Sequence, residues 1–91
     1  MTFSELLGES ILVMVLDFFL ENRFWDYSKT DVAKHIGKSR QSMYNVWPTL
    51  ERFNIIIPSR KIGGTTLYKI NPKSETVKKL SELSLVITAL S

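Results

Sequence analysis

The chain has 91 residues, the usual length of one domain, and it carries a formal net charge of +3 at pH 7. It contains no cysteine and a single histidine, which excludes disulfides, thiolate metal sites and cysteine nucleophiles and leaves no set of metal ligands. Gly-rich phosphate loops and catalytic carboxylate pairs with a supporting histidine are also missing from the sequence. We therefore expect no enzyme activity, no metal and no cofactor.

The N-terminal segment is expected to be neither a secretory signal nor a membrane span. Glu5 and Glu9 stand where a signal peptide carries basic residues. The apolar run over residues 11–20 is shorter than the roughly 20 residues of a membrane-spanning helix, and Asp17 interrupts it. Together with the lack of cysteine, which suits a reducing compartment, this predicts a soluble cytoplasmic protein without a membrane partner.

The charges are distributed unevenly along the chain. Residues 1–27 carry five acidic side chains and one arginine, whereas residues 28–73 carry nine lysines or arginines and two acidic side chains. Residues 74–91 are balanced, with two charges of each sign. A basic segment favours a surface that faces a polyanion, most often nucleic acid, and a generic basic protein is the plainer alternative.

One long helix is predicted over residues 3–21, within an N-terminal segment 1–22. Thr2 and Glu5 have the spacing of a capping box at its start. Apolar residues cover most of its circumference: Leu6, Leu7, Ile11, Leu12, Val13, Met14, Val15, Leu16, Phe18, Phe19 and Leu20. A helix that is apolar nearly all round is buried on more than one side, and in so small a chain we expect another subunit to cover the second side.

Two short helices with a Gly-containing turn between them are predicted over residues 28–53, which is the pattern of a helix-turn-helix. Ser28 and Asp31 form a capping box at the start of the first of these helices. Gly37 suits the left-handed cap at its end. His35 is expected at the surface without a ligand role.

The next helix is predicted over residues 39–53, with Ser39 as its N-cap and Asn54 as a left-handed residue at its end. Pro48 is expected to bend it. Apolar residues at spacings of four, three and three predict its buried stripe: Met43, Trp47, Leu50 and Phe53.

A β-hairpin is predicted over residues 55–71, because β-branched runs flank Gly63 and Gly64 as in a tight primed turn. Pro58 restricts its strand to a sheet edge or a bulge. A last helix is predicted within 72–91, and its apolar residues have the 3, 4, 3 spacing of a short coiled coil: Leu80, Leu83, Ile87 and Leu90.

These elements predict a single domain over residues 1–91 that is mainly α with a small β-hairpin, an α+β fold. Their order resembles that of the archaeal winged helix-turn-helix DNA-binding proteins and transcriptional regulators. The matching segments are YSKTDVAKHIGKSRQSMYNVWPTLERFNII and SRKIGGTTLYKIN. The resemblance implies a recognition helix over 39–53 in the major groove, a wing over 59–69 on the backbone or minor groove, and N- and C-terminal helices that dimerise.

The resemblance also implies that residues near the start of the recognition helix meet base edges. These residues are Arg40, Gln41, Tyr44 and Asn45. Their chemistry suits this role, since arginine can make a bidentate contact to guanine and the amides can do so to adenine. The plainer alternatives are a packing aromatic for Tyr44 and a solvated polar face for Gln41 and Asn45. Three further residues suit phosphates at the helix start: Lys38, Ser39 and Ser42.

The remaining expected DNA contacts lie on the wing and at the start of the preceding helix. On the wing they are Arg60, Lys61, Thr65, Thr66 and Lys69, and at the helix start they are Lys29 and Thr30. The Gly63-Gly64 pair lets the backbone approach DNA closely or simply closes the turn. Trp25 is expected on the exterior or at a subunit contact.

The function that these observations favour is a homodimeric, sequence-specific regulator that binds double-stranded DNA and itself, without a small-molecule effector. A protein-interaction module built on the same fold is the alternative from a different class. The polar and basic start of the recognition helix favours DNA over that alternative. A non-specific architectural chromatin protein is a third possibility.

Overall fold

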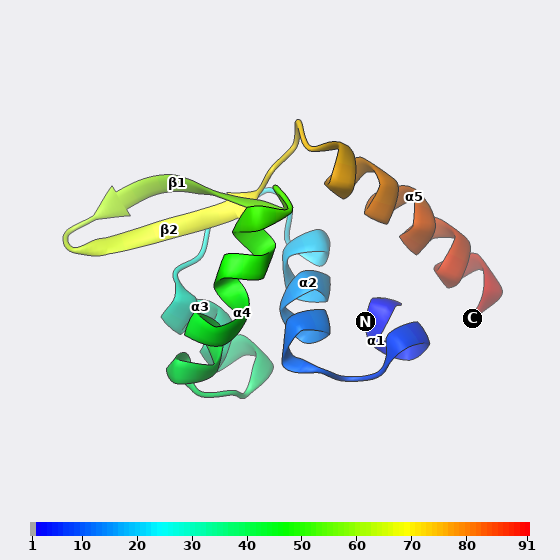
Figure 1. Cartoon of the computed structure of the whole chain (residues 1–91), viewed down its shortest axis with the longest axis horizontal. Coiled ribbons are helices and arrows are strands. Elements are labelled where there is room, and N and C mark those ends of the chain that lie inside the picture. The colour runs from blue at the N-terminus through cyan, green and yellow to red at the C-terminus, as the bar shows by residue number, and fades with distance from the viewer. Residues whose placement is uncertain (1) are drawn as a thin grey trace.

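The computed structural model describes residues 2–91, which form five helices and a two-stranded antiparallel sheet. The elements are α1 (Thr2–Leu7), α2 (Ile11–Glu21), α3 (Lys29–Ile36), α4 (Arg40–Arg52), β1 (Ile56–Ile62), β2 (Thr65–Ile70) and α5 (Glu75–Leu90). The predicted α+β class is therefore confirmed. In Figure 1, α2 lies between the α3–α4 pair and the α1–α5 pair, while the hairpin extends from the end opposite to α5.

The predicted single helix over residues 3–21 is wrong, because the chain breaks it into α1 and α2. Gly8 has φ +88°, a left-handed conformation that glycine adopts without the steric cost of a side chain. Ser10 then begins α2 as its N-cap, and its side chain accepts a hydrogen bond from the amide of Val13. The break lets α1 pack beside α2, so part of the α2 surface assigned to another subunit is covered by the chain itself.

The first turn of α1 is capped by a carboxylate from α2 and not by the predicted Thr2–Glu5 box. Asp17 accepts hydrogen bonds from the amides of Phe3 at 2.8 Å and Ser4 at 2.9 Å, and from Ser4 Oγ at 2.7 Å. Its side chain is only 1% exposed. These contacts satisfy amides that have no partner within a helix, and an anion at this end also suits the helix dipole.

The predicted caps of α3 and the predicted start of α4 are confirmed. Ser28 and Asp31 form the complete capping box of α3, and Gly37 closes it in the left-handed conformation at φ +72°. Ser39 caps α4, whose helix continues without interruption through Pro48.

The buried stripe of α4 is confirmed at Met43, Trp47 and Leu50 but wrong at Phe53, which is 50% exposed. The helix ends at Arg52, so the chain has left the helical path by Phe53, and Asn54 follows with φ +60° as predicted. The guanidinium carbon of Arg52 lies 5.4 Å from the centroid of the Phe53 ring.

The hairpin has the predicted turn and the predicted irregularity at Pro58. Gly63 has φ +61° while Gly64 lies outside the left-handed region, as in a type II′ turn. The register shifts between Pro58 and Arg60, so Ser59 is the extra residue of a β-bulge. On the other edge of the sheet, Tyr27 pairs with Tyr68 through two backbone hydrogen bonds of 2.7 and 2.8 Å.

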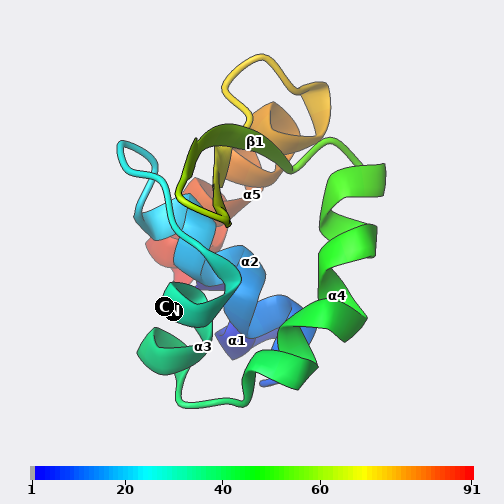
Figure 2. The same ribbon diagram turned by 90° about the vertical axis from the view of Figure 1, so that its left-hand side faces the viewer.

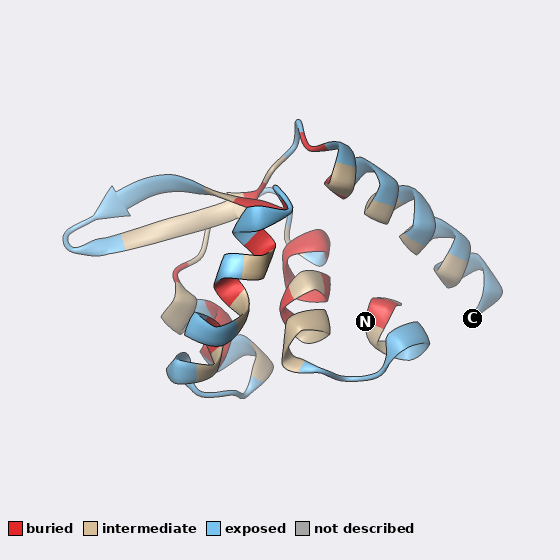
Figure 3. Ribbon diagram, viewed as in Figure 1, coloured by how far each residue is buried: buried red, intermediate tan, exposed pale blue. Residues whose placement is uncertain are grey.

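The last helix begins where predicted, with Ser74 as the N-cap of α5. Its predicted coiled-coil seam is divided, because Leu80 and Ile87 pack on the core of the same chain whereas Leu83 and Leu90 are exposed. Figure 3 shows the exposed outer side along the length of α5. Within residues 2–91, no helix has both the length and the apolar character needed to cross a membrane.

The core joins the helices to the base of the hairpin through edge-to-face aromatic contacts. The Trp47 ring lies 5.7 Å from that of Phe19 on α2 and 5.3 Å from that of Tyr68 on β2. The Phe18 ring contacts those of Tyr27 and His35, each at 4.7 Å between centroids. Since such pairs add to the free energy gained by burying apolar area, they fix the hairpin against α4.

Candidate nucleic-acid interface

A cavity of about 260 Å³ lies where the start of α3, the first turns of α4 and the turn end of β2 meet. Its lining residues are Ser28, Lys29, Thr30, Arg40, Tyr44, Gly64, Thr65, Thr66 and Tyr68. Six of these nine are among the predicted DNA contacts, and they come from three separate elements. The lining residues, all within the described residues 2–91, include two cations, Lys29 and Arg40, and no Asp or Glu. The three elements can be followed in Figure 2, which views the molecule from the side toward which the hairpin extends.

The ammonium of Lys29 is held above three aromatic rings. Its Nζ lies 4.9 Å from the ring centroid of Tyr68, 5.1 Å from that of Tyr44 and 5.4 Å from that of Trp47. Each ring face attracts the cation electrostatically. Because the rings belong to α4 and β2 and the lysine to α3, this contact fixes a positive charge at the junction of all three elements.

Arg40 and Tyr44 stand one helical turn apart on α4 and interact with each other. Nη2 of Arg40 donates a hydrogen bond of 3.1 Å to the Tyr44 hydroxyl, and the guanidinium carbon lies 5.6 Å from the ring centroid. Tyr44 is 48% exposed, so it is neither a core residue nor a free surface residue. It holds both cations of the cavity, the arginine through its hydroxyl and ring and the lysine through its ring.

The other predicted contacts of α4 lie outside the cavity. Gln41 and Asn45 are exposed and are also one turn apart, so they share a side of the helix. Lys38 is exposed just before the helix. The hydroxyls of Ser39 and Ser42 lie 2.9 Å apart, and the Ser39 hydroxyl also accepts the Ser42 amide, so both belong to the helix cap.

The predicted wing cations do not join the cavity. Arg60 forms a bidentate ion pair with Asp26, at 2.8 Å from Nε and 3.2 Å from Nη2. Strand alternation places Arg60, Leu67 and Lys69 on the face of the hairpin opposite to Tyr68. Lys61 is exposed next to the turn.

The sequence prediction missed Tyr68 as a lining residue and Asp26 as the partner of Arg60. Tyr68 had a usable signal, because it lies two residues after the predicted contact Thr66 and therefore shares its face of the strand. Asp26 had none, since it lies 34 residues from Arg60. Ser59 completes this cluster, because the bulge brings its hydroxyl to 2.9 Å from the Asp26 carboxylate.

The Asp26 cluster predicts a specific dependence of stability on pH. The hydrogen bonds from Arg60, with a further one from Ser59, lower the pKa of Asp26 below its ordinary value of 3.8. A carboxyl group whose pKa is lower in the folded state than in the unfolded state stabilises the fold. This stabilisation is fully present when the pH is above the unfolded-state pKa, and it is lost as the pH falls through the folded-state pKa. The Tm of the wild type should therefore exceed that of Asp26→Asn near pH 6, and this difference should shrink below pH 3.8.

Thermal unfolding followed by circular dichroism from pH 6 to pH 2 measures this difference. In an Arg60→Gln background the Asp26→Asn change should alter the Tm much less, because only the hydrogen bond from Ser59 remains. A wild-type advantage that persisted unchanged to pH 2 would show that the ion pair does not stabilise the fold.

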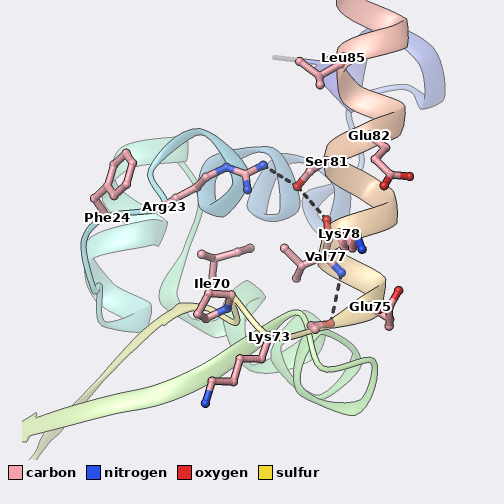
Figure 4. Close-up of a pocket in the computed structure, with 12 residues that line it drawn as sticks. Arg23, Phe24, Ile70, Lys73, Glu75, Val77, Lys78, Ser81, Glu82 and Leu85 are labelled. Atoms are coloured by element: carbon pink, nitrogen blue, oxygen red, sulfur yellow. Dashed lines mark hydrogen bonds between the residues drawn. The ribbon is translucent and has the colours of Figure 1, made fainter.

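A larger cavity of about 520 Å³ lies between the loop after α2, the base of the hairpin and α5. Figure 4 shows Arg23 reaching across to Ser81, to which its Nη2 donates a hydrogen bond of 2.6 Å. The lining combines Lys73 and Lys78 with Glu75 and Glu82, so its charges are mixed. In the part of the chain that the structure describes, no three acidic or histidine side chains gather as metal ligands.

Comparison of the chain with protein-family models, with curated proteins and with solved structures found no match.

Proposed function

We propose that the protein is a winged helix-turn-helix DNA-binding regulator that acts as a homodimer. The observation that carries this proposal is the cavity at the junction of α3, α4 and β2, where six predicted DNA contacts meet without an acidic residue. A surface with several fixed cations and hydroxyls suits the phosphate backbone, whose contacts supply much of the affinity for DNA.

In this proposal α4 enters the major groove by its N-terminal half. The exposed side chains of Gln41 and Asn45 meet base edges, and the cap residues Ser39 and Ser42 lie near the phosphates at the groove edge. The hairpin is the wing, and Lys61 beside its turn reaches a neighbouring stretch of backbone.

The proposed dimer contact lies at the opposite end of the molecule from the hairpin (Figure 1). Leu83, Val86 and Leu90 share one exposed side of α5 because they are spaced by three and four residues. Leu90 lies beside Leu6 of α1, since both line one small cavity. Pairing of this apolar side across a two-fold axis would present two copies of α4 about one turn of DNA apart, roughly 34 Å.

Binding of the purified protein to random-sequence duplexes tests the proposal, with selection for the sequences that are retained. We expect a palindromic enriched site and an affinity that falls with salt. If about six phosphates are neutralised at each site, the slope of log affinity against log salt should be near −5. A slope near zero would refute DNA binding, and binding without any enriched sequence would favour an architectural protein.

A second candidate function is that of a protein-interaction module. The adjacent side chains of Phe24 and Trp25 are 92% and 69% exposed, and aromatic residues are enriched at protein interfaces. This function would be favoured if the protein failed to bind duplex DNA at low salt.

A further inference from the structure

Resting on the proposed function, we infer that the cavity at the junction of α3, α4 and β2 binds one phosphate of the DNA backbone, with Arg40 as a ligand of that phosphate. Base recognition then belongs to Gln41 and Asn45. The sequence assigns four residues of α4 together to base edges. The inference instead places Arg40 and Tyr44 at the phosphate and leaves Gln41 and Asn45 at the bases, so the two pairs affect specificity differently.

The chemistry of the cavity suits a single phosphate group. It combines the guanidinium of Arg40, the ammonium of Lys29 and the hydroxyls of Thr30 and Thr66, with no carboxylate among its described lining residues to repel an anion. These groups can surround a tetrahedral anion with charge-assisted hydrogen bonds. The volume of about 260 Å³ lies below the roughly 300–1,000 Å³ of pockets for whole drug-sized ligands.

The position of Arg40 argues against a role in reading guanine. Its guanidinium is held on the Tyr44 side, with Nη2 bonded to the Tyr44 hydroxyl at 3.1 Å and the guanidinium carbon 5.6 Å from the centroid of the Tyr44 ring. This bond leaves four of the five N–H groups free for a ligand, so the position of the guanidinium in the cavity decides which ligand they reach. Here the guanidinium lines the space between α4 and the wing, together with Lys29, whose ammonium three rings hold in place.

Gln41 and Asn45 are on a different side of the helix. Both are exposed, neither lines the cavity, and their separation of one turn allows them to meet neighbouring base pairs. The inference therefore predicts opposite behaviour for substitutions at adjacent positions of α4.

The test compares Arg40→Ala with Gln41→Ala on the selected site and on a set of single-base variants of it. Arg40→Ala should weaken binding about tenfold on every sequence and make the salt slope shallower by about one, with unchanged base preferences. Gln41→Ala should keep the salt slope and lose preference at one base position. Arg52→Ala is the charge-matched control, because Arg52 lies at the other end of α4 and outside the cavity, and it should weaken binding less than Arg40→Ala.

Duplexes with a neutral methylphosphonate at one backbone position at a time locate the bound phosphate. One position in each half-site should weaken the wild type about tenfold and leave Arg40→Ala almost unaffected, because that variant has already lost the contact. Circular dichroism establishes that each variant is folded.

Two results would overturn the inference while leaving the proposed function intact. The first is a loss of preference at one base in Arg40→Ala, and the second is equal sensitivity of the wild type and Arg40→Ala to every methylphosphonate. Absence of DNA binding by the wild type would instead refute the proposed function.

Discussion

Replacing Asp17 by alanine should lower the free energy of unfolding by about 3 kcal/mol, because it removes all three hydrogen bonds that cap α1. The buried amide of Phe3 would lose its partner, and leaving such a group unpaired costs roughly 1–3 kcal/mol. The six residues of α1 are too few to form a helix without this support. For a domain of this size the Tm should fall by roughly 12–24 °C.

Urea unfolding followed by circular dichroism measures the change. Asp17→Asn keeps the size of the side chain and one acceptor oxygen, so it should lose less stability than the alanine variant. Glu21→Ala is the matched control on the same helix, because Glu21 is exposed, and its effect should stay within about 0.5 kcal/mol. Equal stability of the Asp17→Ala and Glu21→Ala variants would show that the cap does not hold α1 in place.

Replacing Leu83 by lysine should convert the proposed dimer into a monomer. The residue is the first of the exposed stripe Leu83, Val86 and Leu90 of α5, and a charge there would have to be buried without a partner when two copies pair. The solution mass should fall from twice 10.5 kDa to the mass of one chain. Since the two half-sites would no longer be bound together, affinity for a palindromic site should fall by about 100-fold.

Leu85→Lys is the matched control for this prediction. Leu85 is more exposed than Leu83, at 72% against 44%, but it lies two residues further along α5 and therefore on another side. It should keep the dimer mass and the affinity. Light scattering coupled to gel filtration gives the masses, and fluorescence anisotropy gives the affinities. If Leu85→Lys rather than Leu83→Lys disrupted the dimer, the contact would use the side of α5 next to the larger cavity.

The sequence was most informative where the determinants of structure are local. The Ser28–Asp31 box, the Gly37 cap and the Ser39 cap each act within a few residues, and all were predicted at the positions where the structure has them. The hairpin was predictable for the same reason, since its turn depends on two adjacent glycines.

The error at the N-terminus arose where a distant contact decides the structure. Gly8 and Ser10 carry the usual signals for a helix end and a helix start, but the long apolar pattern outweighed them in the prediction. The partner that makes a separate α1 stable is Asp17, which lies 14 residues from Phe3. Phe53 followed the apolar spacing of α4, but the helix ends before it.

Six of the nine residues that line the cavity were predicted from the sequence, but their arrangement was not. Residue type and position were enough to select Lys29, Arg40, Thr66 and their neighbours. Only the packing of three elements shows that they enclose one cavity, and that Arg60 is already paired with Asp26.

The bulge at Ser59 has a consequence for behaviour at high concentration. In the two-stranded sheet, the outer side of β1 is an edge whose free backbone groups could pair with a strand of another molecule. Pro58 offers no N–H there, and the bulge next to it interrupts the regular spacing that such pairing needs. The same irregularity that brings Ser59 to Asp26 therefore also protects the exposed hairpin against edge-to-edge aggregation.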